Sequence, residues 1–140
     1  MLTIRPFHLT DESVVVDLWK RVGLTRPWND PHKDILRKLT VQSEGFLVGE
    51  VEGRIVASVM AGYEGHRGWI NYLAVDPDCQ KLGYGRALMA HAEHWLLAQG
   101  CPKVSLQIRK DNLEAIAFYA HLGFTEDAAV SLGKRLISDE

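Results

Sequence analysis

The segment WINYLAVDPDCQKLGYGR, residues 69–86, guides the interpretation of this 140-residue chain. Residues 69–75 are β-prone and end at Asp76-Pro77, so they predict a strand. Gly83 and Gly85 then stand at the start of a helix. Glycines at this position leave backbone N–H groups unobstructed, and the helix dipole favours an anion there. The segment therefore predicts a strand, a loop and a helix that together bind a phosphate or pyrophosphate.

Two common phosphate motifs do not fit these residues. A Walker loop requires a Lys-Ser/Thr pair, which the segment lacks, and a dinucleotide fingerprint requires a third glycine where this chain has Leu88. A helix that uses glycine only for a tight turn is about equally consistent with the two glycines taken alone.

The rest of the chain predicts an α/β (α+β) domain spanning residues 1–140, with a mixed, mostly antiparallel sheet. Thr10 is the expected cap of the first helix, and Asp30-Pro31 of the second, whose inward side chains are Ile35, Leu36 and Leu39. Glu52-Gly53 predicts a tight hairpin. The expected strands are residues 2–5, 46–51, 54–63, 69–75, 104–108 and 130–137, and the last two helices are expected to end at Gly100 and Gly123.

Composition excludes several classes of function. Hydrophobic residues make up 46% of the chain and charged residues 24%, and the formal net charge is −2, with the basic residues dispersed. We therefore expect neither a nucleic-acid partner nor a membrane partner. Two cysteines are too few for a disulfide framework or a zinc site, and the N-terminus lacks the apolar run of a signal peptide, so we expect a cytoplasmic protein without a metal.

Two motifs together resemble a known superfamily. The loop QKLGYG, preceded by YLAVDP, is similar to the acyl-CoA pyrophosphate loop of the GNAT (Gcn5-related N-acetyltransferase) superfamily, and NLEAIAFYAHLGF, residues 112–124, is similar to its second signature. RPWNDP and GYEGHRG further resemble the small bacterial YpeA-like acetyltransferases. The resemblance covers nearly the whole chain and implies a GNAT-like fold that uses acetyl-CoA.

The resemblance also implies which residues hold acetyl-CoA. The backbone of a splayed strand would pair with the pantetheine arm, loop amides would hold the pyrophosphate with help from two cations, and the second motif would contact the pantetheine region. In that order, the residues are Leu73, Ala74 and Val75; Gln80, Lys81, Leu82, Gly83, Tyr84, Gly85 and Arg86; and Asn112 and Phe118. Asn112 is equally well explained as a helix N-cap.

Tyr119 is the candidate general acid, since a phenol within reach can protonate the departing CoA thiolate. The resemblance assigns no general base, because the positions that carry a base in related enzymes hold Trp69, Asn71 and Gln107 here. Trp69, Asn71 and Leu73 are expected on one strand face, where Asn71 would anchor a water. Glu64 is the first candidate base and His66 an alternative, although a solvated turn carboxylate explains Glu64 at least as well.

The acceptor is expected to be a small-molecule or peptide amine. The loop between the first two helices combines Arg26 and Trp28, which with Asn71 form the predicted acceptor site, and Arg26 or Arg67 would contact an acceptor carboxylate. We expect direct transfer in a ternary complex, because no activated nucleophile is evident. A non-catalytic acyl-CoA sensor and a nucleotide-binding protein remain alternatives, and a homodimer through the C-terminal strand is a further expectation.

Overall fold

The structure is a computed structural model that describes residues 1–140. Its strands are β1 (Thr3–Pro6), β2 (Phe46–Val51), β3 (Arg54–Tyr63), β4 (Gly68–Val75) and β5 (Val104–Ser105), and its α-helices are α1 (Glu12–Arg21), α2 (Pro31–Lys38), α3 (Tyr84–Ala98) and α4 (Leu113–His121). Short 3-10 helices cover Leu9–Asp11, Ser43–Gly45 and Pro77–Cys79. None of the α-helices combines the length and apolar character that a membrane span needs.

The strands form one sheet in the order β1-β2-β3-β4-β5, in which β1 to β4 are antiparallel and β5 lies parallel to β4. The predicted mixed, mostly antiparallel sheet is therefore confirmed. Glu52 and Gly53 both have positive φ, 51° and 77°, as the tightest hairpin turns require.

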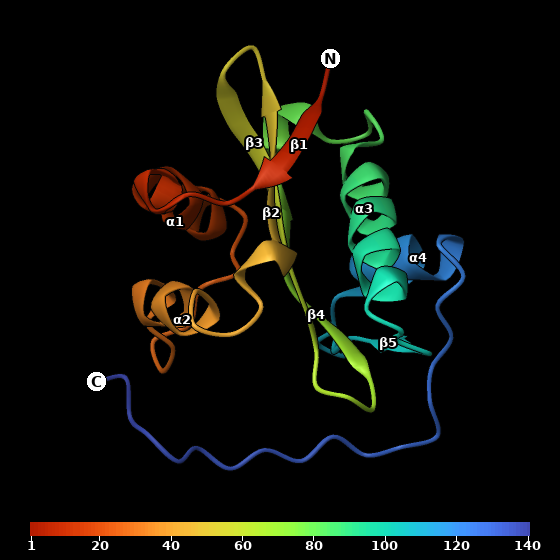
Figure 1. The fold of residues 1–140 in the computed structure, drawn as a ribbon. Coiled ribbons are helices and arrows are strands. Elements are labelled where there is room, and N and C mark those ends of the chain that lie inside the picture. The colour runs from red at the N-terminus through yellow and green to blue at the C-terminus, as the bar shows by residue number, and fades with distance from the viewer.

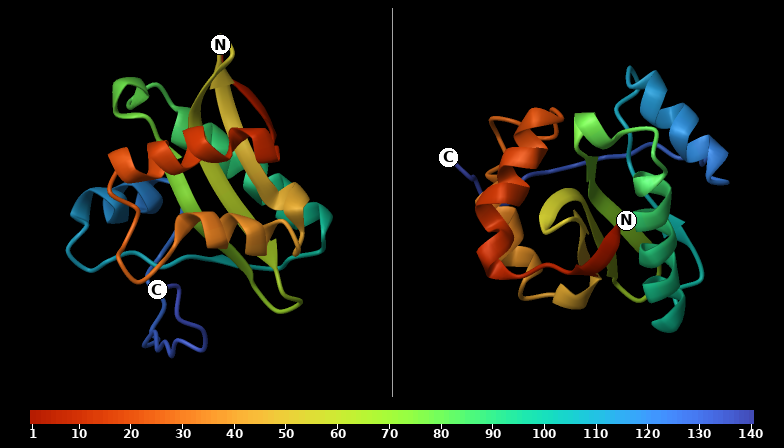
Figure 2. Two further views of the ribbon diagram at one scale, coloured as in Figure 1. Left: turned by 90° about the vertical axis from the view of Figure 1, so that its left-hand side faces the viewer. Right: turned by 90° about the horizontal axis from the view of Figure 1, so that it is seen from above.

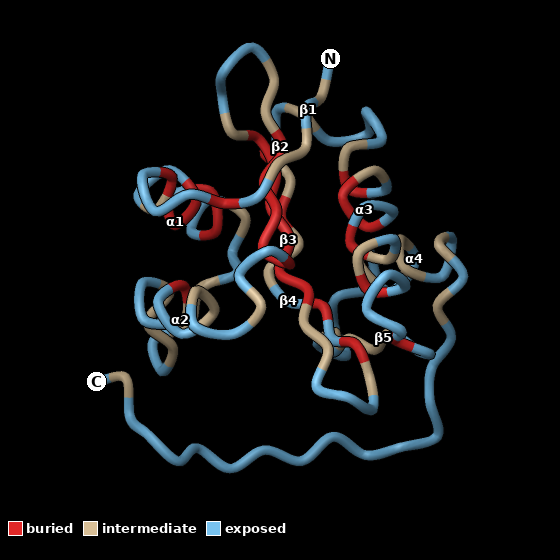
Figure 3. Tube along the Cα trace, viewed as in Figure 1, coloured by how far each residue is buried: buried red, intermediate tan, exposed pale blue.

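Helices α1 and α2 cover one face of the sheet, and α3 and α4 lie on the other (Figures 1 and 2). Each face has its own apolar cluster. Trp19, Phe46 and Ile35 belong to the cluster under α1 and α2, and Leu88 and Leu96 belong to the one under α3. Buried residues concentrate along the central strands and the facing sides of the helices (Figure 3).

A β-bulge interrupts β4 at Tyr72. Asn71 pairs with Met60 and Ala74 with Ser58, so three steps on β4 match two on β3, and Tyr72 has a φ of 53°. The extra residue reverses the alternation of side chains, because Ile70 and Leu73 both pack in the α3-side cluster. The expectation that Leu73 shares a face with Trp69 and Asn71 was therefore wrong.

Strands β4 and β5 pair only at Gly68 with Val104 and at Trp69 with Ser105, and then separate. The strand expected over residues 104–108 is thus only two residues long. Beyond Trp69, β4 has a partner strand on the β3 side alone. This splay opens a gap beside the second half of β4.

Three further expectations were wrong. Thr10 lies inside a 3-10 helix whose capping contacts come from His8 and Asp11, so it does not cap α1. Leu36 was expected to point inward, but its side chain is 54% exposed, and Ile35 is the one buried residue of α2. Residues 130–137 form no strand; the chain after α4 instead runs in an extended path across the molecule to α2 (Figure 1).

Candidate active site

The loop from Gln80 to Arg86 offers an uninterrupted run of free backbone donors. None of the N–H groups of residues 80–86 donates to an acceptor within the chain, and the first amide to do so afterwards is that of Ala87, to Gly83. Gly83 occupies the N-cap of α3 in the left-handed conformation and provides no capping side chain. The loop thus has the backbone geometry of an anion site at a helix N-terminus.

Two cations accompany these amides. Lys81, whose φ is 67°, and Arg86 are exposed and take part in no ion pair. Gln80 reaches back toward the end of β4, with its Nε2 3.5 Å from the Val75 carbonyl oxygen. The loop therefore presents unpaired positive charge next to the open end of β4.

Gly85 lies where β4, α3 and α4 meet. A Cβ placed on Gly85 would lie 3.2 Å from Cζ of Phe118 and 3.6 Å from Cγ2 of Val75. The missing side chain thus lets Phe118 approach the first turn of α3. Val75, Gly85 and Phe118 thus meet here, one from each of the three segments that the family resemblance assigns to acetyl-CoA.

The second motif forms α4. Asn112 is its N-cap, with Oδ1 accepting from the Ala115 amide at 3.1 Å. At the other end, the Phe124 amide donates to the Tyr119 carbonyl, and the rings of Tyr119 and Phe124 meet edge to face at 5.5 Å. The cap role of Asn112 and the end of this helix at Gly123, whose φ is 95°, are confirmed.

Tyr119 lies among aromatic and aliphatic side chains. Its ring contacts Phe118 edge to face at 5.1 Å, and its hydroxyl makes no hydrogen bond within the chain. Burial raises the pKa of Tyr119 to about 12, because the ionised phenolate would lose its hydration. The phenol is therefore fully protonated at neutral pH and has a proton to donate.

Glu64 lies in the exposed turn between β3 and β4. Its Oε1 accepts from the amide of His66 at 2.5 Å and from the amide of Arg67. The Arg67 amide and then the His66 amide lower the pKa of Glu64, because they stabilise its charged form. The carboxylate thus organises the turn, and its lowered pKa makes it a weaker base.

No basic side chain replaces Glu64 along β4. Asn71 and Trp69 are exposed. The side-chain amide of Asn71 has no hydrogen-bond partner in the chain, so it is free to hold a water or an acceptor group. Gln107 is engaged with the Ser131 hydroxyl.

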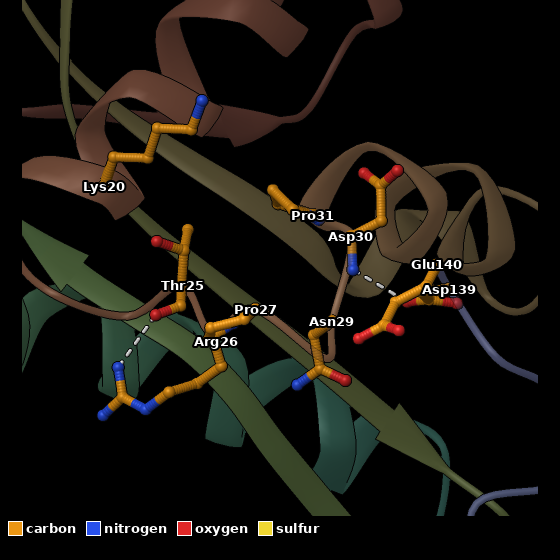
Figure 4. A pocket seen from close by; sticks show the side chains of 9 residues that line it. All are labelled: Lys20, Thr25, Arg26, Pro27, Asn29, Asp30, Pro31, Asp139 and Glu140. Carbon is orange, nitrogen blue, oxygen red and sulfur yellow. Dashed lines mark hydrogen bonds between the residues drawn. The ribbon is translucent and has the colours of Figure 1, made fainter.

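The loop between α1 and α2 borders a polar cavity of about 480 Å³ (Figure 4). The cavity is lined by Lys20, Thr25, Arg26, Pro27, Asn29, Asp30, Pro31, Asp139 and Glu140. Arg26 donates from Nη1 to the carbonyls of Gly23 at 2.8 Å and Thr25 at 2.9 Å, so much of its hydrogen bonding stabilises its own loop. Trp28 is 49% exposed, and Cζ of Arg109 lies 5.8 Å from its ring centroid.

Sequence reasoning missed a network that connects β4 to α1 and α2. The rings of Trp19 and Tyr72 are stacked, with their centroids 3.8 Å apart. Trp19 Nε1 donates to Ser58 Oγ, and the Ser58 hydroxyl donates to the Tyr72 carbonyl oxygen at 2.9 Å. The Tyr72 hydroxyl donates to Asp34 at 2.6 Å. No motif marks these residues, because a bulge and its partners are set by tertiary packing.

No three His, Cys, Asp or Glu side chains are grouped so that they could hold a metal ion. The two cysteines, Cys79 and Cys101, are free.

A splayed sheet with a free-amide loop at the start of the following helix agrees with the fold and loop that the resemblance to acetyltransferases implies. The model of the acetyltransferase (GNAT) family matches residues 13–124, and the chain belongs to this family.

Similar proteins agree with this assignment. The chain is 48% identical to an acetyltransferase of Pectobacterium atrosepticum over 99% of this chain and 98% of that protein, and 47% identical to one of Yersinia enterocolitica over 99% of both. Among solved structures it resembles Ard1 of Thermoplasma volcanium, with a TM-score of 0.82 and 30% identity over 91% of this chain and 84% of the other. The ribosomal-protein-S18-alanine N-acetyltransferase of Escherichia coli gives a TM-score of 0.75 and 28% identity over 91% and 80%. The chain is accordingly an N-acetyltransferase.

Proposed function

We propose that this enzyme transfers the acetyl group of acetyl-CoA to a primary amine by direct attack within a ternary complex. The observation that supports it most strongly is the run of free N–H groups at residues 80–86, placed between the open part of β4 and α4. These amides, with Lys81 and Arg86, suit a pyrophosphate, and the unpaired side of residues 73–75 suits the amides of a pantetheine arm.

In the proposed reaction the amine nitrogen attacks the thioester carbonyl carbon, the C–S bond breaks and the CoA thiolate leaves. Tyr119 donates its phenolic proton to the departing sulfur, and the phenolate regains the proton as the product amide nitrogen loses one. The raised pKa of Tyr119 supports this role, because the group is protonated at every pH at which the amine is reactive.

The acceptor that best suits this site is an α-amino group. Such an amine has a pKa of about 7.7–8.0 and is substantially neutral near pH 8, whereas a lysine amine near 10.4 would need a strong base. Glu64 is tied into its turn, and Asn71 has no basic side chain. The Escherichia coli S18-alanine N-acetyltransferase, by its name, acts on an alanine of a protein.

Calorimetric titration with acetyl-CoA, CoA, ATP and NAD tests the donor site. We expect acetyl-CoA to bind with a dissociation constant in the micromolar range, about −8 kcal/mol, and ATP and NAD not to compete with it. Absence of binding to any CoA species would overturn the donor assignment. Equal binding of ATP would favour a nucleotide site.

Acceptor choice is tested by CoA release with two peptides of one sequence. One has a free N-terminal alanine and no lysine, and the other has a blocked N-terminus and a single lysine. We expect turnover with the first peptide and little with the second. Turnover with the lysine peptide alone would contradict the α-amino assignment.

The alternative is a protein that binds acyl-CoA without transferring the acyl group. The observation in its favour is the lack of a free basic side chain at Trp69, Asn71 and Gln107. Tight acetyl-CoA binding without CoA release on peptides, small amines and aminoglycosides would establish it in place of the enzyme.

A further inference from the structure

The C-terminal segment returns to the α1–α2 loop and is attached there by a well-enclosed carboxylate. After α4 the chain extends across the molecule and ends beside α2 (Figure 1). Most side chains after Phe124 are exposed, but the Asp139 side chain is only 1% exposed. An enclosed carboxylate in an otherwise exposed segment needs compensating partners.

Those partners all belong to α2, to the residue before it, or to the segment itself. Asp139 Oδ2 accepts from the Asp30 amide at 2.8 Å, and Oδ1 accepts from Arg37 at 2.7 Å. Lys33 Nζ donates to the Asp139 carbonyl at 3.0 Å, and Arg135 lies 3.7 Å from Oδ1. Arg37 and then the Asp30 amide lower the pKa of Asp139 to about 2, so the carboxylate is charged throughout the working range.

A second attachment lies one step further into the loop. Arg135 donates from Nη2 to Asn29 Oδ1. Asp30 and Asn29 are consecutive, and both line the polar cavity of Figure 4, where Asp139 forms part of the wall. The C-terminal segment therefore closes one side of the cavity and fixes the end of the loop that carries Arg26 and Trp28.

Two contact paths lead from this attachment to the acetyl-transfer site. Trp28 lies next to Arg109, which follows β5 and precedes the Asn112 cap of α4. Arg37, the partner of Asp139, also pairs with Asp34 at 3.2 Å, and Asp34 accepts from the Tyr72 hydroxyl at the β4 bulge.

We propose that Asp139 is a positioning residue for acceptor binding: with Arg37 and the Asp30 amide, it holds the α1–α2 loop in place and so completes the acceptor pocket. The inference rests on the proposed acetyl transfer. Asp139 contacts neither the free-amide loop nor Tyr119. We therefore expect its replacement to weaken acceptor binding and to leave the donor site unchanged.

Amide hydrogen exchange tests the attachment without any acceptor. In Asp139→Ala we expect the peptides covering residues 24–31 to exchange at least about tenfold faster, because the Asp30 amide loses its acceptor. Asp127→Ala is the matched control, since Asp127 lies in the same segment and pairs with Lys103, away from α2. Unchanged exchange in Asp139→Ala, or equal acceleration in the control, would overturn the proposal.

Steady-state kinetics with the alanine-initiated peptide test the consequence. We expect Asp139→Ala to raise KM for the peptide about tenfold with kcat within about twofold, and calorimetry to give an unchanged acetyl-CoA affinity. Arg37→Gln should reproduce the change, and the double variant should add little to either single one. An unchanged KM with normal kcat would overturn the proposal.

Failure of the proposed function is distinguishable from failure of this inference. If the unsubstituted protein binds acetyl-CoA but acetylates neither peptide, the α-amino acceptor of the proposed function fails, and Asp139 has no role in binding such a peptide. If the unsubstituted protein acetylates the peptide and Asp139→Ala behaves as the Asp127→Ala control does, only the positioning role fails.

Discussion

Tyr119 combines a half-buried phenol, a raised pKa and a hydroxyl without a partner. A tyrosine that served only to fill the core would gain little from its hydroxyl, because desolvating a polar group without a hydrogen bond is unfavourable. At the scale of single residues, this unused donor beside Phe118 supports the proposed general-acid role of Tyr119.

We expect Tyr119→Phe to lower kcat about 100-fold or more, as loss of a general acid does, while the free energy of unfolding stays within about 1 kcal/mol. Stopped-flow or steady-state CoA release and urea unfolding measure the two quantities. The rate of the unsubstituted enzyme should rise as the acceptor amine deprotonates and show no alkaline fall up to pH 10, since the Tyr119 pKa is about 12.

Tyr63→Phe is the matched control, because the Tyr63 hydroxyl contacts only the Gly65 carbonyl in the β3–β4 turn. A kcat in Tyr119→Phe equal to that of this control would remove the general-acid assignment.

Single residues differ in how far the sequence could specify them. Tyr119, Asn112 and the two loop glycines belong to short local motifs. The helix or loop in which each of them lies could therefore be predicted from the sequence. Asp139 and Asp30 are 109 positions apart, and no periodicity joins an extended tail to a helix start. Glu64 was open to two explanations, and its turn hydrogen bonds favour the structural one.

At the scale of elements, the bulge in β4 depends on a small buried polar network. Ser58 is fully buried and is the acceptor for the indole N–H of Trp19 as well as the donor to Tyr72. Because Tyr72 has a positive φ, which is unfavourable for an aromatic residue, its conformation requires such support.

Ser58→Ala should therefore destabilise the protein by about 1–3 kcal/mol, because it leaves the buried Trp19 N–H without its acceptor. Urea unfolding followed by tryptophan fluorescence measures this difference. Ser13→Ala, an exposed change in α1, is the control and should fall within about 0.5 kcal/mol of the unsubstituted protein. Equal stability of the two variants would show that the network is not needed.

The contact between α3 and α4 depends on the absence of a side chain at Gly85. Gly85→Val should push Phe118 away, because even a Cβ would lie 3.2 Å from its ring. We expect weaker acetyl-CoA binding and a lower kcat, since α4 carries Tyr119. Calorimetry and CoA release measure both; Gly133→Ala, where nothing lies within 4 Å, is the control. Unaltered binding and kcat in Gly85→Val would contradict this account.

Elements with strong local signals were predictable, and those formed by tertiary contacts were not. The sequence predicted the first and last residues of β2 and β3 correctly, and it also predicted the start of α2 at Asp30-Pro31. The β4 bulge, the early end of β5 and the missing last strand depend on which neighbours each segment meets, and alternation along one strand carries no such information.

At the scale of the whole molecule, acid stability should depend on Asp11. Its pKa is lowered chiefly by its hydrogen bond with Arg5, with Arg5 Nη1 2.8 Å from Oδ2. The folded-state pKa thus lies below the unfolded one, so the pair stabilises the fold above the unfolded pKa, and this contribution is lost as pH falls through the folded value.

Urea unfolding at pH 7 and pH 2.5 tests this linkage. We expect the difference in stability between the two pH values to be smaller in Asp11→Asn than in the unsubstituted protein. Asp17→Asn, which breaks an exposed pair with Arg21, is the control and should leave that difference nearly unchanged. An Asp11→Asn variant that follows the unsubstituted protein would refute the assignment.

Self-association stays a prediction at this scale. Val130 and Leu132 are 85% and 90% exposed, because the expected last strand is not formed. We expect light scattering to give a mass of twice 15.7 kDa at high protein concentration and Leu132→Ser to lower it. A mass of one chain at all concentrations would contradict a dimer.

The gap between β4 and β5 has a consequence for handling the purified enzyme. Backbone groups of a strand that lacks a neighbour can pair with a strand of another molecule and so begin edge-to-edge aggregation. The opening proposed for a pantetheine arm thus also leaves one side of the second half of β4 without a partner strand in the ligand-free protein. A donor molecule seated along residues 73–75 would cover these groups, and the concentration of CoA species in a preparation would then govern its shelf life as well as its activity.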